Sequence, residues 1–446
     1  MRFSRVVWSL VACLLIGVNG WSDDWPQWLG PQRDSIWRED GILNQFPSGG
    51  PKVIWRAPVG AGYTGPAVAG ERVFLMDRIP APGTKPVNNS FGRTGGQGTE
   101  RILCFSAKDG KLLWKHEYEC SYKIMYPLGP RCTPTVHQGK VYALGAMGHL
   151  FCLNADDGKV LWSKHLPAEY QCDVPPAGCA CHPLIDGDKL ICYAGGNGSL
   201  VVALDKDTGK EIWRSLTAAE IGYCPPVMIE RDGKKQLIIW HPEGVASLDP
   251  NNGKPYWQQP FRSGMNMNIS APRLDGDLLF ITSFFNGSLL LRLKDDQKAE
   301  LVWEGKGSVQ QRGSGMRGMM CTPFCANGYV YGVCGNGELR CLKAETGERL
   351  WDTLNTTVPN KRPMQWANAF IVKQGERFFL ANERGELIIA KLTPAAFEEI
   401  DRVKIIEPTH AVSGREVVWS HPAFAHRCVF ARNDKELVCV SLAKDQ

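Results

Sequence analysis

The sequence predicts an all-β fold, an eight-bladed β-propeller made of four-stranded blades. A strand–turn–strand phrase recurs along most of the chain, and it is clearest over residues 150–162, where an Asp-Gly turn joins two apolar strands and the second ends in tryptophan. Tryptophans repeat at a nearly constant spacing, and an extra strand near the start can complete the last unit. A period in the forties with several short strands per period is typical of a propeller.

The first twenty residues predict a signal peptide. Arg2 and Arg5 precede an apolar stretch over residues 6–18, and small residues follow it. An alternative is the lipoprotein-like sequence that ends at Cys13, which would attach the mature chain peripherally to a membrane. Either way we expect an exported protein, located in the periplasm, on the cell surface or in the medium.

Residues 21–50 form a lead-in that does not share the repeat. It contains Trp25, Trp28 and Trp37, and three large aromatic side chains in one short segment are expected to be buried. We therefore expect the lead-in to pack on the propeller, either inside its central channel or on its rim.

Residues 51–446 carry the repeat. The tryptophans that end successive units are interpreted as structural packing residues, each worth about 3–5 kcal/mol if truncated to alanine; they are Trp55, Trp114, Trp162, Trp213, Trp257, Trp303 and Trp351. Unit seven lacks this tryptophan, and its outer strand is expected over residues 400–405. Unit eight, over residues 419–442, provides three strands only. The strand over residues 53–55 is predicted to pair with it, which closes the ring and removes an exposed edge.

Two columns of small residues explain many of the sixteen cysteines. The first column lies two residues before the proline that opens each inner strand: Thr64, Cys132, Cys181, Cys224, Ser270, Cys321, Ala367 and Ser420. The second lies in the third strands: Cys104, Cys152, Ala203, Ser247, Cys341, Ala390 and Cys439, with Arg292 as an exception. We interpret both as tight packing sites between blades. The pairing of the other cysteines is left open.

The repeat resembles the PQQ-like (quinoprotein alcohol dehydrogenase-like) eight-bladed propeller family. The resemblance is clearest in the Leu-Asp-x-x-Thr-Gly-Lys-x-x-Trp form of residues 204–213 and extends over residues 51–442. The Trp-Pro-Gln-Trp-x-Gly-Pro lead-in also resembles the start of exported bacterial members. The family includes quinone-dependent dehydrogenases and cofactor-free scaffolds such as the outer-membrane assembly lipoprotein.

The resemblance implies a specific site for the dehydrogenases: a vicinal Cys-Cys disulfide, a tryptophan platform, a calcium ion and a catalytic aspartate. The sequence has no Cys-Cys pair, and its nearest approach is Cys179-Ala-Cys181. We therefore expect no cofactor, metal or catalytic residue, and keep a PQQ- and calcium-dependent dehydrogenase as the alternative. A hydrolase or lyase using Glu243, His241 or His182 is a third hypothesis, although no acid–base pair is assembled.

The candidate binding face is the side of the ring that carries the long connections, over residues 80–100, 119–131, 166–180 and 305–320. Binding residues concentrate on long loops held by a rigid scaffold. The candidate residues are Arg93, Arg131, Trp240, Glu243, Arg312, Arg317, Trp366 and Trp419, with Asn88, Asn89, Tyr170, Gln310 and Gln311 beside them.

Charge excludes one class of partner. The net charge of +5 falls to +3 without Arg2 and Arg5, which is too little to indicate nucleic-acid binding. We also expect no transmembrane helix in the mature chain. The sequence therefore predicts an exported, non-catalytic propeller that binds a protein or a glycan through its long-loop face.

Overall fold

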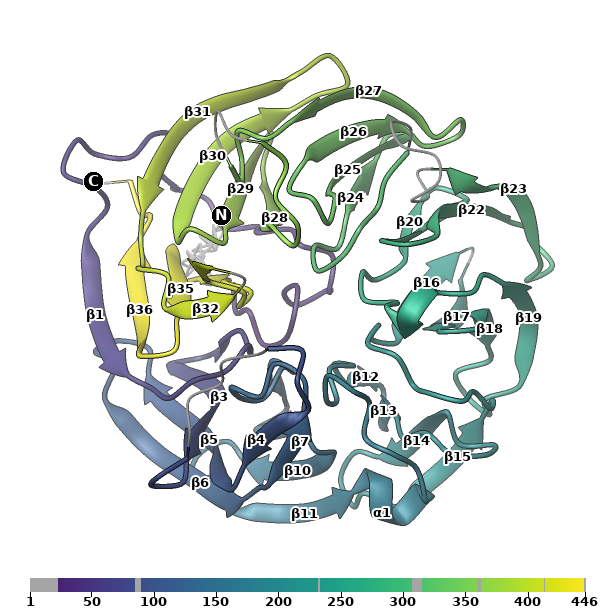
Figure 1. The fold of residues 1–446 in the computed structure, drawn as a ribbon, viewed down its shortest axis with the longest axis horizontal. Helices are drawn as coiled ribbons and strands as arrows, with labels where there is room; N and C mark the ends of the chain where they lie inside the picture. Colours follow the sequence, from purple (N-terminus) through teal and green to yellow (C-terminus); the bar gives the residue numbers. More distant parts are fainter. Residues whose placement is uncertain are drawn as a thin grey trace, which may run out of the picture.

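The computed structural model describes residues 23–84, 90–231, 233–306, 315–358, 362–412 and 414–444. Eight antiparallel four-stranded sheets stand in a ring around a central axis (Figure 1), so the predicted eight-bladed propeller is confirmed. The expected signal peptide and Cys13 lie outside the described residues. In the described part of the chain, no helix has both the length and the apolarity needed to cross a bilayer.

Each blade is formed by strands in chain order from the axis outward, except that the last blade takes its outer strand from the start of the chain. The first four blades are β2 (Ala67–Ala69), β3 (Arg72–Pro80), β5 (Gly98–Ser106), β6 (Leu112–Glu119); β8 (Thr135–His137), β9 (Lys140–Leu144), β10 (His149–Asn154), β11 (Val160–His165); β12 (Leu184–Asp186), β13 (Lys189–Tyr193), β14 (Val201–Asp205), β15 (Glu211–Ser215); and β16 (Val227–Arg231), β17 (Lys234–His241), β18 (Gly244–Leu248), β19 (Pro255–Pro260). The next three are β20 (Arg273–Asp275), β21 (Leu278–Ser283), β22 (Gly287–Leu293), β23 (Ala299–Lys306); β24 (Phe324–Ala326), β25 (Tyr329–Val333), β26 (Leu339–Lys343), β27 (Glu348–Thr353); and β28 (Ala369–Gln374), β29 (Arg377–Asn382), β30 (Glu386–Leu392), β31 (Phe397–Lys404).

The two ends of the chain close the ring in the eighth blade. Its sheet runs β1 (Val53–Pro58), β36 (Glu436–Ser441), β35 (Cys428–Arg432) and β34 (Ala423–Ala425), with Trp55 opposite Cys439. The predicted pairing of the first strand with the last unit is confirmed. The outer strand of blade seven, β31, begins three residues earlier than expected.

The repeated tryptophans join each blade to the next. Each indole N–H donates to a backbone carbonyl in the following blade: Trp55 to Ala107, Trp114 to Ala155, Trp162 to Lys206, Trp213 to Pro250, Trp303 to Ala344 and Trp351 to Thr393. The distances lie between 2.8 and 3.1 Å. In the fourth blade, the Trp213 ring lies against Gly253, where a Cβ atom would approach the ring to 2.6 Å. The glycine of the turn is therefore needed for the indole to dock.

Two units depart from this contact. Trp257 donates to Gln236 of its own blade, and the turn over residues 294–298 in the fifth blade differs in length and sequence from the other turns. Blade seven has Glu399 in the place of a tryptophan, opposite Ala390. The eighth blade has no turn to receive an indole there, since β36 and β1 come from opposite ends of the chain.

The two small-residue columns are buried as expected. Thiols of the first column contact backbone carbonyls of the next unit: Cys132 with Cys179, Cys181 with Gly222 and Cys224 with Ser270. The second column faces the tryptophans, and there the alignment needs a correction. Leu290, not Arg292, stands opposite Trp303, because β22 has two irregularities in its register. All fifteen cysteines of the described chain are free thiols.

The lead-in crosses the central channel and contacts the inner strands of several blades. Trp25 forms an antiparallel bridge with Val68 in β2, and Ile36 a parallel bridge with Lys373 in β28. Arg33 donates to the carbonyl of Pro183, and its own carbonyl accepts from Arg273 in β20.

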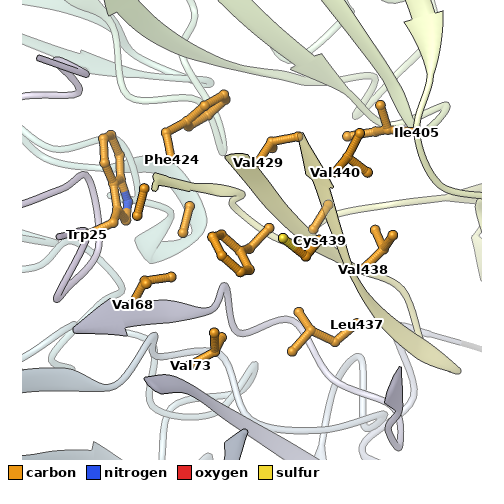
Figure 2. Packing of buried hydrophobic residues seen from close by; sticks show 14 of the residues in the cluster. Trp25, Val68, Val73, Ile405, Phe424, Val429, Leu437, Val438, Cys439 and Val440 are labelled. Carbon is orange, nitrogen blue, oxygen red and sulfur yellow. The ribbon is translucent and has the colours of Figure 1, made fainter. Parts of the chain in front are cut away.

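Trp25 and Trp37 also belong to a large core cluster with blades one, seven and eight. Figure 2 shows Trp25 beside Val68 and Phe424 in this cluster. The lead-in therefore lies in the central channel. The sequence alone did not distinguish this position from one on the rim.

Prediction for the interblade contact. The variant Gly253→Ala should lower the unfolding free energy more than Gly276→Ala. Both glycines have left-handed backbone, with φ of +73° and +61°, so both substitutions cost about 1–2 kcal/mol. Only the first also displaces an indole, which adds about 1–3 kcal/mol, because nothing lies within 4 Å of a Cβ at Gly276. Guanidinium unfolding of the two variants measures the difference, and equal midpoints would show that the turn glycine does not serve the tryptophan.

Candidate functional site

The connections between strands gather at one mouth of the channel. The short strand β4 (Thr94–Gly96), inside the first blade, pairs with β7 (Tyr122–Ile124), which lies between the first and second blades. The long connection inside the first blade and the long connection from the first blade to the second therefore emerge on the same side of the ring, as expected. A second hairpin, β32 (His410–Val412) with β33 (Arg415–Val417), lies in the connection between the last two blades. The remaining short elements of the connections are the helix α1 (Leu166–Tyr170) and the 3-10 turn η1 (Gly264–Asn266).

A cavity of about 490 Å³ occupies this mouth. We define its floor as Trp28, His182, Phe370 and His421, which belong to the lead-in and to the starts of inner strands. We define its collar as the lining residues from the connections between blades: Met125, Tyr126, Pro176, Ala177, Glu220, Tyr223, Met265, Asn266, Met267, Met319, Met320, Trp366 and Trp419. Tyr63, Arg131, Ala180, Pro225 and Ile269 complete the lining.

The collar is rich in methionine. Five of the eleven methionines of the chain line this one cavity: Met125, Met265, Met267, Met319 and Met320. Met267, Met319 and Met320 pack in one cluster with Trp366, whereas Met265 is 75% exposed on the rim. Methionine is flexible and polarizable, so such a collar can adapt to an apolar ligand.

The floor is a stack of aromatic and imidazole rings. Trp28 lies parallel to His182, with ring centres 4.8 Å apart, and its indole N–H donates to Nε2 of His421 at 3.2 Å. The His421 ring in turn lies 3.8 Å from Phe370. Burial lowers the pKa of His421 to about 3 and lowers the pKa of His182 well below its usual value. Both imidazoles are therefore uncharged at neutral pH.

Four collar residues other than glycine have left-handed backbone: Tyr126, Met265, Asn266 and Trp366, with φ between 50° and 66°. This conformation is sterically unfavourable for residues with a side chain. Such strain persists only where the surroundings impose it, and it concentrates at binding sites. The collar is thus held in shape by the blades beneath it.

Arg131 and Tyr63, two polar residues of the cavity wall, are already engaged. The Arg131 guanidinium donates to the carbonyls of Gly129, Met125 and Tyr126 and lies over the Tyr63 ring at 5.1 Å. The Tyr63 hydroxyl is 3.1 Å from Nε2 of His410. Arg131 therefore holds the backbone of the collar in place, and its guanidinium is already occupied by these carbonyls.

A buried carboxylate holds one side of the collar in place. Glu383, which is 3% exposed, accepts from the Trp419 indole at 3.0 Å and from the Arg415 guanidinium at 2.9 Å. Its carbonyl also accepts from the amide of Val418 at 2.7 Å. Glu383 thus links the β32–β33 connection to blade seven and fixes the orientation of Trp419.

The structure brings three of the expected site residues together, since Arg131, Trp366 and Trp419 all line the cavity. Arg93 is exposed and lines a neighbouring cavity of about 340 Å³ that shares Glu220 with the first.

Two other expected residues, Glu243 and Arg317, do not line the cavity. Glu243 is exposed and accepts from the amide of Ala219. Arg317 lies over the Phe284 ring at 5.5 Å. Arg312, like Asn88, Asn89, Gln310 and Gln311, falls outside the described residues.

Trp240 requires a correction. It was expected at the mouth, but it is completely buried and packs against Phe261 inside the fourth blade. All residues of β17 from Gln236 to His241 are buried, so its side chain belongs to the core and is not presented to a partner.

Sequence reasoning named Trp28 as a packing residue and His182 as a possible catalytic group, but it did not place them in a common floor, and it missed most of the collar. His182 and His421 directly follow Cys181 and Ser420 of the first small-residue column, and this position could have identified them. The methionines could have been noticed as Met265-Asn-Met267 and Met319-Met320 in two adjacent connections. In the part of the chain that the structure describes, no three His, Cys, Asp or Glu side chains are grouped to hold a metal ion.

Comparison with known proteins identifies two kinds of relative. The family model described as outer membrane protein assembly factor BamB matches residues 98–304 and 245–446. BamB of Yersinia pestis is 26% identical over 212 residues, which are 45% of this chain and 48% of that protein. The quinoprotein ethanol dehydrogenase of Pseudomonas putida is 30% identical over 247 residues, 47% of this chain and 39% of that protein. The chain thus matches half or less of the length of these relatives.

Solved structures show the same fold. BamB from Moraxella catarrhalis superimposes with a TM-score of 0.52 at 15% identity, covering 83% of this chain and 99% of that one. The quinohemoprotein alcohol dehydrogenase from Comamonas testosteroni gives a TM-score of 0.59 at 12% identity, covering 95% and 81%. At these identities, the likeness concerns the fold alone.

Prediction for the clamp. The variant Glu383→Gln should lower the unfolding free energy by about 1–3 kcal/mol, because the buried amide has one acceptor oxygen for the two partly buried side chains that donate to Glu383. Hydrogen exchange in the β32–β33 connection should become faster. The control Glu399→Gln removes an exposed carboxylate from Arg402 and should change stability by about 0.5 kcal/mol or less. Equal effects of the two variants would show that Glu383 does not hold the β32–β33 connection in place.

Proposed function

The chain belongs to the family of the outer membrane protein assembly factor BamB, and from that membership we propose that it is a non-catalytic binding propeller. Its ligand is an apolar segment of a protein partner, and the mouth cavity is the binding site. We also propose that it acts outside the cytoplasm, as the signal-peptide expectation for residues 1–20 implies.

The observation that carries this proposal is the composition of the collar. Five thioether and several aromatic side chains surround a cavity of about 490 Å³, a volume within the usual range for ligand pockets. Methionine-rich surfaces suit proteins that bind varied apolar segments, because the flexible side chains repack around each ligand. An apolar protein segment fits this lining better than a glycan, which needs several free hydrogen-bonding groups.

The alternative, a quinone-dependent dehydrogenase, is favoured by the similarity to quinoprotein ethanol dehydrogenase. Pyrroloquinoline quinone carries three carboxylates and requires cationic partners. Among the described residues, Arg131 is the only lysine or arginine in the lining, and its guanidinium already bonds to three carbonyls. Glu220, the single carboxylate among the described lining residues, would repel such a ligand. The residues present do not fit the quinone, and we assign no reaction to the cavity.

Prediction for the partner. A photo-crosslinking residue at Met265 should give one discrete crosslinked product in cells, because this side chain is 75% exposed on the rim. The same residue at Leu301, which is 46% exposed on outer strand β23, should not. The double substitution Met319→Lys and Met320→Lys should abolish the product by placing two charges in the apolar collar. Equal crosslinking at both positions, or crosslinking that survives the lysines, would refute the mouth as the binding site.

Prediction for the quinone. Calorimetric titration of the purified protein with pyrroloquinoline quinone and calcium should give no saturable uptake, and a dye-linked alcohol oxidation assay should show no turnover. The physical reason is the lack of free cations around an apolar cavity. Stoichiometric uptake with turnover would overturn the binding proposal in favour of the dehydrogenase.

A further inference from the structure

The chemistry of the collar suits a second kind of ligand. We propose that the methionine collar binds one soft monovalent metal ion, Cu(I), through the thioethers of Met267, Met319 and Met320. This inference does not depend on whether a protein partner occupies the same mouth.

Met267, Met319 and Met320 come from two adjacent connections and line the same cavity. Met267 lies between blades four and five, Met319 and Met320 lie between blades five and six, and all three pack in a single cluster. Thioether sulfur is a soft ligand that favours Cu(I) over harder divalent ions. Trp366 and Trp419 belong to the same cluster, and an indole face attracts a cation.

A second, independent observation points to a metal ligand in this cavity. His182 is 92% buried, since its exposed fraction is 8%, and neither of its ring nitrogens has a hydrogen-bond partner. A buried donor or acceptor without a partner costs about 1–3 kcal/mol, and such a group calls for an explanation, for example an ion. The ring is uncharged, as a metal-binding imidazole must be. His182 lines the same cavity as these methionines and is the nitrogen donor that we assign to the ion.

The charge of the lining also favours a monovalent ion. Among the described lining residues, Glu220 is the only carboxylate and Arg131 the only lysine or arginine, so their charges balance. The Oε2 of Glu220 is buried without a partner. In a lining with no net charge, burying a divalent ion costs more free energy than burying a monovalent one. Calcium and magnesium would also need several oxygen ligands, which the described lining residues do not provide.

The test follows the methionine methyl groups by carbon-13 NMR while Cu(I) is added without oxygen. Affinity is measured by competition with the chromogenic chelator bicinchoninate. Thiols also bind Cu(I), and Cys172, Cys325 and Cys428 are only partly buried, so accessible thiols are first alkylated with iodoacetamide. We expect one equivalent of Cu(I) to shift the resonances of Met267, Met319 and Met320 and to leave that of the fully buried Met76 unchanged.

Matched variants separate thioether chemistry from apolarity. Met319→Leu with Met320→Leu keeps the size and apolarity of the collar, a change that folded proteins tolerate well, and should weaken Cu(I) binding at least tenfold. Met228→Leu, in the partly buried inner strand β16, is the control and should leave the affinity unchanged. His182→Phe keeps the stack on Trp28, removes both nitrogens and should also weaken binding.

The inference is overturned if the alkylated protein takes no Cu(I) from the chelator, or if the double leucine variant binds it as tightly as the wild type. The proposed function is judged separately, because the leucine variant keeps an apolar collar. Its crosslinking from Met265 should persist whether or not Cu(I) binds, and loss of that crosslink would count against the protein partner alone.

Discussion

The ring depends on one repeated contact, the docking of a tryptophan of each blade onto the turn of the next. The indole satisfies its N–H with a carbonyl across the blade boundary and lies against a glycine that a larger residue could not replace. Each blade thus contacts mainly its neighbours, as in other repeat proteins. Two units lack the contact. Trp257 donates within its own blade, and blade seven, which precedes the blade in which the chain ends meet, has Glu399 in place of the tryptophan.

Periodicity decided how much the sequence could predict. The blades repeat along the chain and the buried small residues recur in most of them, so a residue in one unit could be checked against its counterparts in the others. The collar does not repeat, since each connection has its own length and composition, and its methionines gave no periodic signal. Trp240 was misplaced for a related reason. It stands near the end of β17, but that strand is buried from Gln236 to His241 and does not alternate there between core and solvent.

The lead-in turns a symmetric ring into an asymmetric site. An eight-bladed ring built only of repeats would leave its channel open, with similar inner strands on every side. Here Trp25 and Ile36 pair with inner strands β2 and β28, and Trp28 closes the channel beneath the mouth by stacking on His182. The cavity therefore has a floor that no repeat unit provides. This explains why the lead-in holds three buried tryptophans although it contributes no blade.

The collar and the floor differ in stiffness, and this difference gives the mouth its chemical character. The floor is a stack of rings fixed by the lead-in and by two inner strands, whereas the collar places flexible thioethers on a strained backbone clamped from below, as Glu383 clamps Trp419. A leucine collar would be as apolar, but branched side chains adapt less well and have no lone pairs to offer. The polarizable sulfur that lets methionine follow an apolar ligand also makes it a ligand for a soft cation. One choice of residue therefore supports both proposals for this mouth, and exchanging sulfur for carbon at constant size is the change that separates them.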